Sequence, residues 1–90
     1  MRQLLALLIM SVIHVNIAQS AKLQVDSEPT GAMVFFDGHY VGLTPLTIDG
    51  VIPGKHLLKL LKHGYKAWVS AIEVTEQENK VSVRLIQYKP

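Results

Sequence analysis

No cysteine occurs in the chain, so neither a disulfide bond nor a thiolate metal site can stabilise it. A clear excess of charge of one sign is missing too. Arg2 is the only one of the nine Lys and Arg residues before position 21, which leaves eight against seven Asp and Glu. These charges are scattered and form no basic stripe, which argues against a nucleic-acid surface.

Long apolar runs are absent as well. The longest, Leu4 to Ile13, has ten residues, whereas a membrane-spanning helix needs about 20. Arg2 before the run, and Ala18 and Ser20 after it, give the order of a secretory signal peptide. We therefore predict a signal peptide at residues 1–20, cut after Ser20. Cleavage after Ala21 is the next candidate, and an uncleaved anchor is the competing interpretation. The domain of residues 21–90 is then secreted or periplasmic, with no membrane insertion after cleavage.

Glycine and proline recur at short intervals in residues 21–90 and divide them into segments of strand length. KLQVDS alternates apolar and polar residues, with Leu23 and Val25 on one face, and KVSVRL does the same near the other end. Asp37-Gly38 lies between two apolar segments. Because both residues tolerate positive φ, the dipeptide predicts a hairpin with a two-residue turn.

The segment HLLKLLKHGY, residues 56–65, has the spacing of an amphipathic helix and also alternates like a strand. A helix between Gly54 and Gly64 would hold about nine residues, and helices shorter than about 12 residues are marginal in water. No Ser, Thr, Asp or Asn stands at its start to cap it. We predict a strand, with an amphipathic surface helix as the alternative.

The order of these signals resembles the PEGA domain family. The segment SEPTGAMVFFDGHYVGLTP, residues 27–45, is similar to the family pattern S-x-P-x-G-A, alternating apolar residues, D-G and a closing G-x-T-P. A second part of the pattern, a glycine, a strand and then Gly-Tyr, is similar to Gly54 through Tyr65. Thr30, where the family name has glutamate, and the apolar LLKLL are departures. The resemblance implies a β-domain over residues 21–90 that acts as an accessory module of envelope and surface proteins.

We predict an all-β fold, a small two-layer β-sandwich of about seven short strands preceded by the signal peptide. The expected strands are Lys22–Ser27, Ala32–Phe36, His39–Val41, Leu46–Ile48, Lys55–Leu61, Lys66–Val74 and Lys80–Ile86. The expected core contains Leu23, Val25, Ala32, Val34, Phe36, Leu46, Ile48, Leu58, Leu60, Tyr65, Ile72, Val74, Val81, Val83 and Leu85.

Residues that could carry chemistry are few and dispersed. His39, His56 and His63 lie in separate segments, whereas zinc needs three or four converging ligands. Asp37 is two residues from His39, but its simpler role is to form the turn. Ser27, Ser70 and Ser82 have no nucleophile signature around them. We predict no enzyme activity, no catalytic residue, no metal site and no cofactor.

Apolar residues occupy the strand face that should meet solvent. If Val34 and Leu58 point inward, then Met33, Phe35, Leu57 and Leu61 point outward. Two covered faces or a capping loop would explain these side chains without a partner, but the sharper hypothesis is a contiguous binding patch. Tyr40 and Trp68 are candidate glycan contacts, because aromatic faces stack on sugar rings.

These observations predict a non-catalytic exported module of the cell envelope that binds an envelope or secreted partner protein. The alternative is a carbohydrate-binding module of the cell wall, with a cell-wall polysaccharide as its ligand. An enzyme or an enzyme inhibitor has no support in the sequence.

Overall fold

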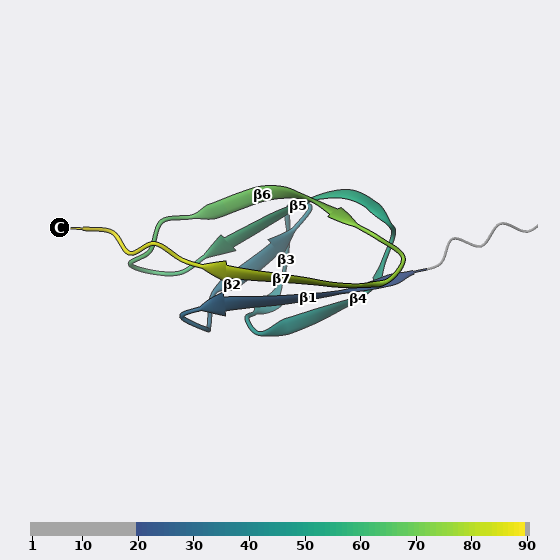
Figure 1. Cartoon of the computed structure of the whole chain (residues 1–90). Helices are drawn as coiled ribbons and strands as arrows, with labels where there is room; N and C mark the ends of the chain where they lie inside the picture. Colours follow the sequence, from purple (N-terminus) through teal and green to yellow (C-terminus); the bar gives the residue numbers. More distant parts are fainter. Residues whose placement is uncertain (1–19, 90) are drawn as a thin grey trace, which may run out of the picture.

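The computed structural model describes residues 20–89, which form two β-sheets (Figure 1). The predicted all-β fold with seven strands is confirmed. Within residues 20–89, no helix is long and apolar enough to span a membrane. The predicted signal peptide lies outside the described residues, apart from Ser20. The strands are β1 (Ala21–Glu28), β2 (Met33–Phe36), β3 (His39–Leu43), β4 (Leu46–Val51), β5 (Gly54–Leu61), β6 (Trp68–Val74) and β7 (Glu78–Arg84).

The smaller sheet has three strands in the order β4-β1-β7. β1 pairs antiparallel with β4 and parallel with β7, in a register that places Asp26 opposite Ser82. Figure 1 shows β1 and β7 side by side and running in the same direction. The two ends of the described chain therefore lie at opposite ends of the sandwich.

The larger sheet has four antiparallel strands in the order β3-β2-β5-β6. The predicted turn joins β2 to β3, with φ of 49° at Asp37 and 87° at Gly38. Positive φ at both central residues is the geometry of a primed hairpin turn, whose twist matches that of the flanking strands. The pairing of β2 with β3 shifts between Val34 and Phe35, so Val41 is an extra residue on β3.

The ambiguous segment HLLKLLKHGY is a strand over its first half, as predicted. β5 runs from Gly54 to Leu61 and pairs with both β2 and β6. It is a central strand, so its backbone groups form hydrogen bonds to neighbouring strands on both sides. A nine-residue helix would form too few hydrogen bonds to offset its nucleation cost. The strand ends before a turn at His63-Gly64, where the Tyr65 N–H donates to the Lys62 carbonyl.

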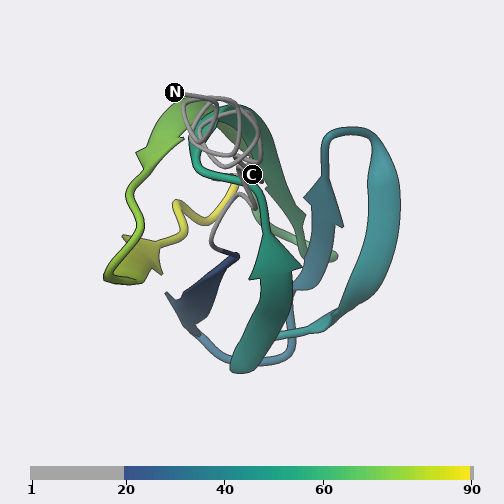
Figure 2. The ribbon, with the colours of Figure 1, turned by 90° about the vertical axis from the view of Figure 1, so that its right-hand side faces the viewer.

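The core lies between the two sheets, which Figure 2 shows from the end. Every expected core residue is buried or packs against the buried cluster. The sequence prediction omitted Ala21, Val51 and Trp68: the first two are 4% and 3% exposed, and Trp68 is half-buried. β4 was predicted to end at Ile48, but it continues to Val51 because Val51 pairs with Ala21 on β1. β3 also extends beyond the prediction, to Leu43, and β6 begins later than predicted, at Trp68.

Two loops that are distant in sequence meet at one end of the sandwich. The Gly31 N–H donates to the Thr44 carbonyl at 3.0 Å, and the Thr44 N–H donates to the Ala32 carbonyl at 2.9 Å. The side-chain oxygen of Thr44 accepts a third hydrogen bond, from the Ala32 N–H, at 3.0 Å. The residues of the S-x-P-x-G-A and G-x-T-P patterns therefore hold the two sheets together by hydrogen bonds, in addition to the apolar core.

Candidate functional site

The outer face of the four-stranded sheet is built by the period-two geometry of its strands. Successive side chains of a strand point to opposite faces, and residues that pair across strands share a face. Leu58 and Leu60 of β5 are fully buried, so Leu57 and Leu61 point outward. Met33 pairs with Leu61, which places its side chain on the same outer face.

This outer face carries apolar side chains on all four strands, with Lys59 among them and the cross-strand pair Lys55–Glu73 toward one end. Its exposed members include Met33 at 39%, Leu57 at 49% and Val69 at 53%, and Phe35 and Leu61 are half-buried among them. The four residues predicted as a patch therefore lie on one face, and the register adds three more to them. We define the apolar face as Met33, Phe35, Tyr40, Leu43, Leu57, Leu61 and Val69.

Lys59 lies at the centre of the apolar face. In the register it pairs with Phe35 on one side and Val69 on the other. Its ammonium nitrogen is 5.3 Å from the centre of the Phe35 ring, which is the geometry of a cation–π contact. The Phe35 ring in turn packs at a tilt against Tyr40, with 5.6 Å between ring centres. A cation and two aromatic rings thus cross three strands in a row.

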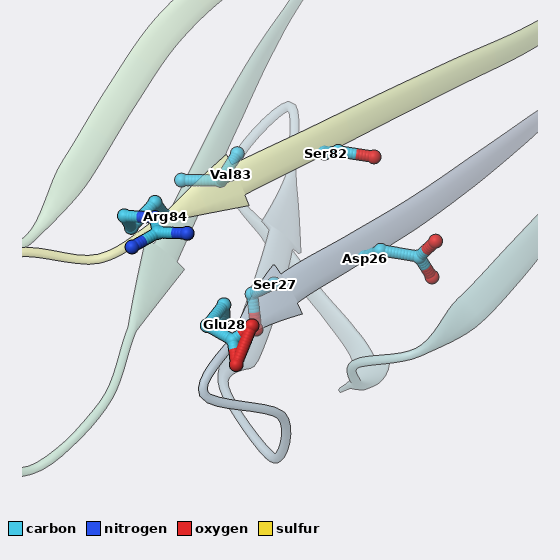
Figure 3. A pocket seen from close by; sticks show the side chains of 6 residues that line it. All are labelled: Asp26, Ser27, Glu28, Ser82, Val83 and Arg84. Carbon is cyan, nitrogen blue, oxygen red and sulfur yellow. The ribbon is translucent and has the colours of Figure 1, made fainter.

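The outer face of the three-stranded sheet is polar by contrast. Lys80 lies 3.8 Å from an Asp26 carboxylate oxygen, and Lys22 lies 4.0 Å from Asp49. An open depression of about 300 Å³ is on this side. Figure 3 shows that its lining comes from the neighbouring strands β1 and β7, with Asp26 beside Ser82. It is a shallow space between strand neighbours, and no enclosed site forms there.

Asp37 and His56 form a contact that the sequence prediction missed. One Asp37 carboxylate oxygen is 2.6 Å from His56 Nδ1, and the other accepts the Leu57 N–H at 2.8 Å. His56 Nε2 is 2.6 Å from the Ile52 carbonyl, which can only accept, so Nε2 carries a proton. The His56 ring also stacks on Phe36, with 4.7 Å between ring centres. No local pattern in the sequence indicates this contact, because 19 positions separate the two residues.

The electrostatics of this pair follow from its hydrogen bonds. The contact with Asp37 and the Ile52 carbonyl raise the pKa of His56 above its ordinary 6.5. The Leu57 N–H and then His56 lower the pKa of Asp37 below 3.8. Both ring nitrogens of His56 are occupied, Nδ1 by the Asp37 carboxylate and Nε2 by the Ile52 carbonyl. An imidazole with both nitrogens occupied is not available to activate a nucleophile.

The remaining histidines do not join this pair in a metal site. His39 and His63 are exposed. Among residues 20–89 no group of three or more His, Asp or Glu side chains could hold a metal ion. Ser70 and Ser82 make no hydrogen bond to a histidine in that range, and the Ser27 hydroxyl is used inside the fold.

The two candidate glycan contacts are not brought together. Tyr40 is 55% exposed and belongs to the apolar face, on the edge strand β3. Trp68 pairs with the buried Leu60 and packs against the core, on the opposite edge strand β6. Because the two rings lie on opposite faces and opposite edges of one sheet, they cannot stack on the same sugar.

A comparison with known proteins identifies the family. A search of the curated proteins found no match to this chain. The PEGA domain model matches residues 20–88, which is nearly all of the described sequence. The hydrogen-bonded residues Gly31, Ala32 and Thr44, and the Asp37-Gly38 turn, lie within the matched range and account for the family pattern in structural terms. The chain belongs to the PEGA domain family.

Proposed function

We propose that this protein is a non-catalytic, exported module of the cell envelope that binds a partner protein through the apolar face. The observation that supports the proposal is the contrast between the two outer faces. One face carries Lys–Asp pairs and polar side chains, as a solvated sheet surface should. The other exposes large apolar side chains on four adjacent strands.

The distribution of these side chains argues for a site more strongly than their number. Single exposed apolar residues are ordinary on soluble proteins, whereas a contiguous set marks an interaction surface. The face also contains the types of residue that are enriched at interface centres, namely Tyr40, Phe35 and Met33. The face is carried by a sheet, which is rigid. A partner that covers it therefore orders few additional side chains, and the small loss of conformational entropy favours binding.

The experiment places a photo-crosslinking amino acid at position 57, within the apolar face, in cells that express the full chain. The same amino acid at position 86 is the control, because Ile86 is 62% exposed outside that face. We expect a discrete protein adduct from position 57 alone, and mass spectrometry identifies it. Adducts only with wall polysaccharide, or equal adducts from both positions, would contradict the proposal.

The identified protein is then purified and titrated with variants. Met33→Ser combined with Leu57→Ser should weaken binding by at least about tenfold, since two central contacts are lost. Ile52→Ser combined with Ile86→Ser is the matched control, because both residues are exposed and lie outside the apolar face. The control variant should bind like the unmodified protein.

A further inference from the structure

Charge is divided unequally between the two halves of the sandwich. Residues 33–43 and 54–74, which contain the four-stranded sheet, carry four lysines against Asp37 and Glu73. β1, β4, β7 and the loop that precedes β7 carry three Lys or Arg residues against five Asp or Glu. The apolar face therefore belongs to the positive half of a domain that is nearly neutral as a whole.

Lys59 is the lysine of this positive half that lies within the apolar face. On the polar face, Lys22 and Lys80 each have an aspartate within 4.0 Å. Among residues 20–89, no carboxylate lies within that distance of Lys59, and its ammonium group contacts the Phe35 ring instead. In the free protein, water solvates the remainder of this group. A partner that covers the apolar face removes that water.

The removal of water from an unpaired ammonium group costs several kcal/mol, about as much as a cation–π contact and a few apolar contacts return. A partner that binds here must therefore supply an acceptor of opposite charge. We propose that the apolar face binds a protein segment in which apolar side chains flank an Asp or Glu, whose carboxylate pairs with Lys59. This inference rests on the proposed function and specifies the chemistry of its partner.

Two other occupants fit the geometry less well. In a symmetric pair of copies, a twofold axis through the centre of the apolar face brings two Lys59 ammonium groups together, which is unfavourable. A bilayer surface is flat, whereas adjacent strands of a sheet are rotated by roughly 20–25° and give a saddle shape. A strand or helix of another protein can follow that saddle.

The test selects random 12-residue peptides displayed on phage against the full-chain protein and then measures the recovered peptides as synthetic probes. We expect peptides in which an Asp or Glu lies between apolar residues. Lys59→Glu should weaken their binding by at least about 30-fold, the loss for one partner of a desolvated charge pair. Lys59→Arg should restore most of the affinity, because a guanidinium keeps both the charge and the stacking on Phe35.

The matched charge control is Lys66→Glu, which changes the net charge equally but lies in the connection between β5 and β6, outside the apolar face. This variant should change affinity by less than about fivefold, as exposed charges do. An equal loss from Lys59→Glu and Lys66→Glu would show that overall charge acts instead of a local pair, and would overturn the inference.

The remaining outcomes separate this inference from the proposed function. Peptides whose binding is lost with Met33→Ser and Leu57→Ser but is indifferent to Lys59→Glu would overturn the carboxylate partner alone. If the selection recovers no peptide whose binding depends on the apolar face, that result would count against both proposals. Sedimentation velocity and vesicles of phosphatidylcholine with phosphatidylglycerol complete the test. A dimer, or vesicle binding, that Leu57→Ser abolishes would assign the face to a second copy or to lipid and would overturn the inference.

Discussion

The hydroxyl oxygens of Ser27 and Thr44 lie 2.6 Å apart in the interior, although 17 positions separate these residues. The Ser27 hydroxyl donates to the Pro29 carbonyl at 2.7 Å, which uses its only hydrogen. Thr44 must therefore donate to Ser27, while its own oxygen accepts the Ala32 N–H. The result is a directional chain of hydrogen bonds from Ala32 through Thr44 and Ser27 to Pro29.

This chain predicts a specific cost for the loss of the Thr44 hydroxyl. Thr44→Val keeps the shape of the side chain but leaves the buried Ala32 N–H without its side-chain acceptor. We expect the free energy of unfolding to fall by about 1–3 kcal/mol. Urea titrations followed by the fluorescence of Trp68, the single tryptophan, measure it.

Ser27→Ala removes the next link of the same chain and completes a double-mutant cycle. Because the two side chains act in one network, the double variant should lose less stability than the sum of the two single variants. Thr44→Ser is the control that keeps the hydroxyl. Strictly additive losses would show that the two hydroxyl groups are not coupled.

The Asp37–His56 pair predicts a dependence of stability on pH. The pKa of His56 is raised above 6.5 by folding, so its contribution is fully present below pH 6.5 and is lost as pH rises through the raised value. The pKa of Asp37 is lowered below 3.8, so its contribution is present above pH 3.8 and is lost as pH falls through the lowered value. Stability from this pair is therefore greatest between pH 3.8 and 6.5.

Asp37→Asn tests the pair without disturbing the turn, because Asn tolerates the left-handed conformation of this position. The His56 proton signals in an NMR titration should then change at a lower pH than in the unmodified protein. Stability measured across about pH 5 to 8, where histidine charge changes, should also vary less. An unchanged titration of His56 in this variant would refute the coupling.

The alternation along β5 predicts opposite results for two adjacent leucines. Leu58→Ala deletes a fully buried side chain and should cost about 2–5 kcal/mol of unfolding free energy. Leu57→Ala changes a side chain that is 49% exposed and should cost less than about 1 kcal/mol. Urea titrations of both variants compare them directly, and similar losses would contradict the assigned faces.

The burial of Ala21 bears on the predicted cleavage site. Ala21 is 4% exposed and pairs with Val51, so removal of Ala21 would take away part of the core and of the β1–β4 pairing. Cleavage after Ser20 leaves it in place. If the chain is exported as we propose, we therefore expect cleavage to leave Ala21 as the first residue, which an intact mass measurement of the protein from cells checks. A mass that corresponds to a chain beginning at Lys22 or at Met1 would show that the prediction is wrong.

The sequence was informative wherever a signal is local. Leu58 and Leu60 against Leu57 and Leu61 could be assigned to two faces because successive side chains of any strand point to opposite sides. The Asp37-Gly38 turn could be predicted because few residue pairs accept its backbone angles. Met33, Phe35, Leu57 and Leu61 could be assigned to one outer face for the same reason, while their role as a binding patch stays a prediction.

The sequence was uninformative wherever a feature depends on the pairing of two segments that are distant along the chain. Asp37 and His56 are 19 positions apart, and only the pairing of β2 with β5 brings them into contact. Ala21 and Val51 belong to the core because β4 extends along β1, which alternation in either segment cannot reveal. Tyr40 and Trp68 are both candidate glycan contacts by residue type, and only the sheet shows that they lie on opposite faces.

By itself, then, the amino-acid sequence determined that the chain forms seven strands, that Asp37-Gly38 makes a hairpin turn and that Leu57 and Leu58 lie on opposite faces, since these depend on residues within a few positions of one another. The tertiary structure alone decided the parallel pairing of β1 with β7, the hydrogen-bond chain through Ser27 and Thr44, and the position of Lys59 at the centre of an apolar surface. Those features arise from strand order, which is set by the packing of the whole core.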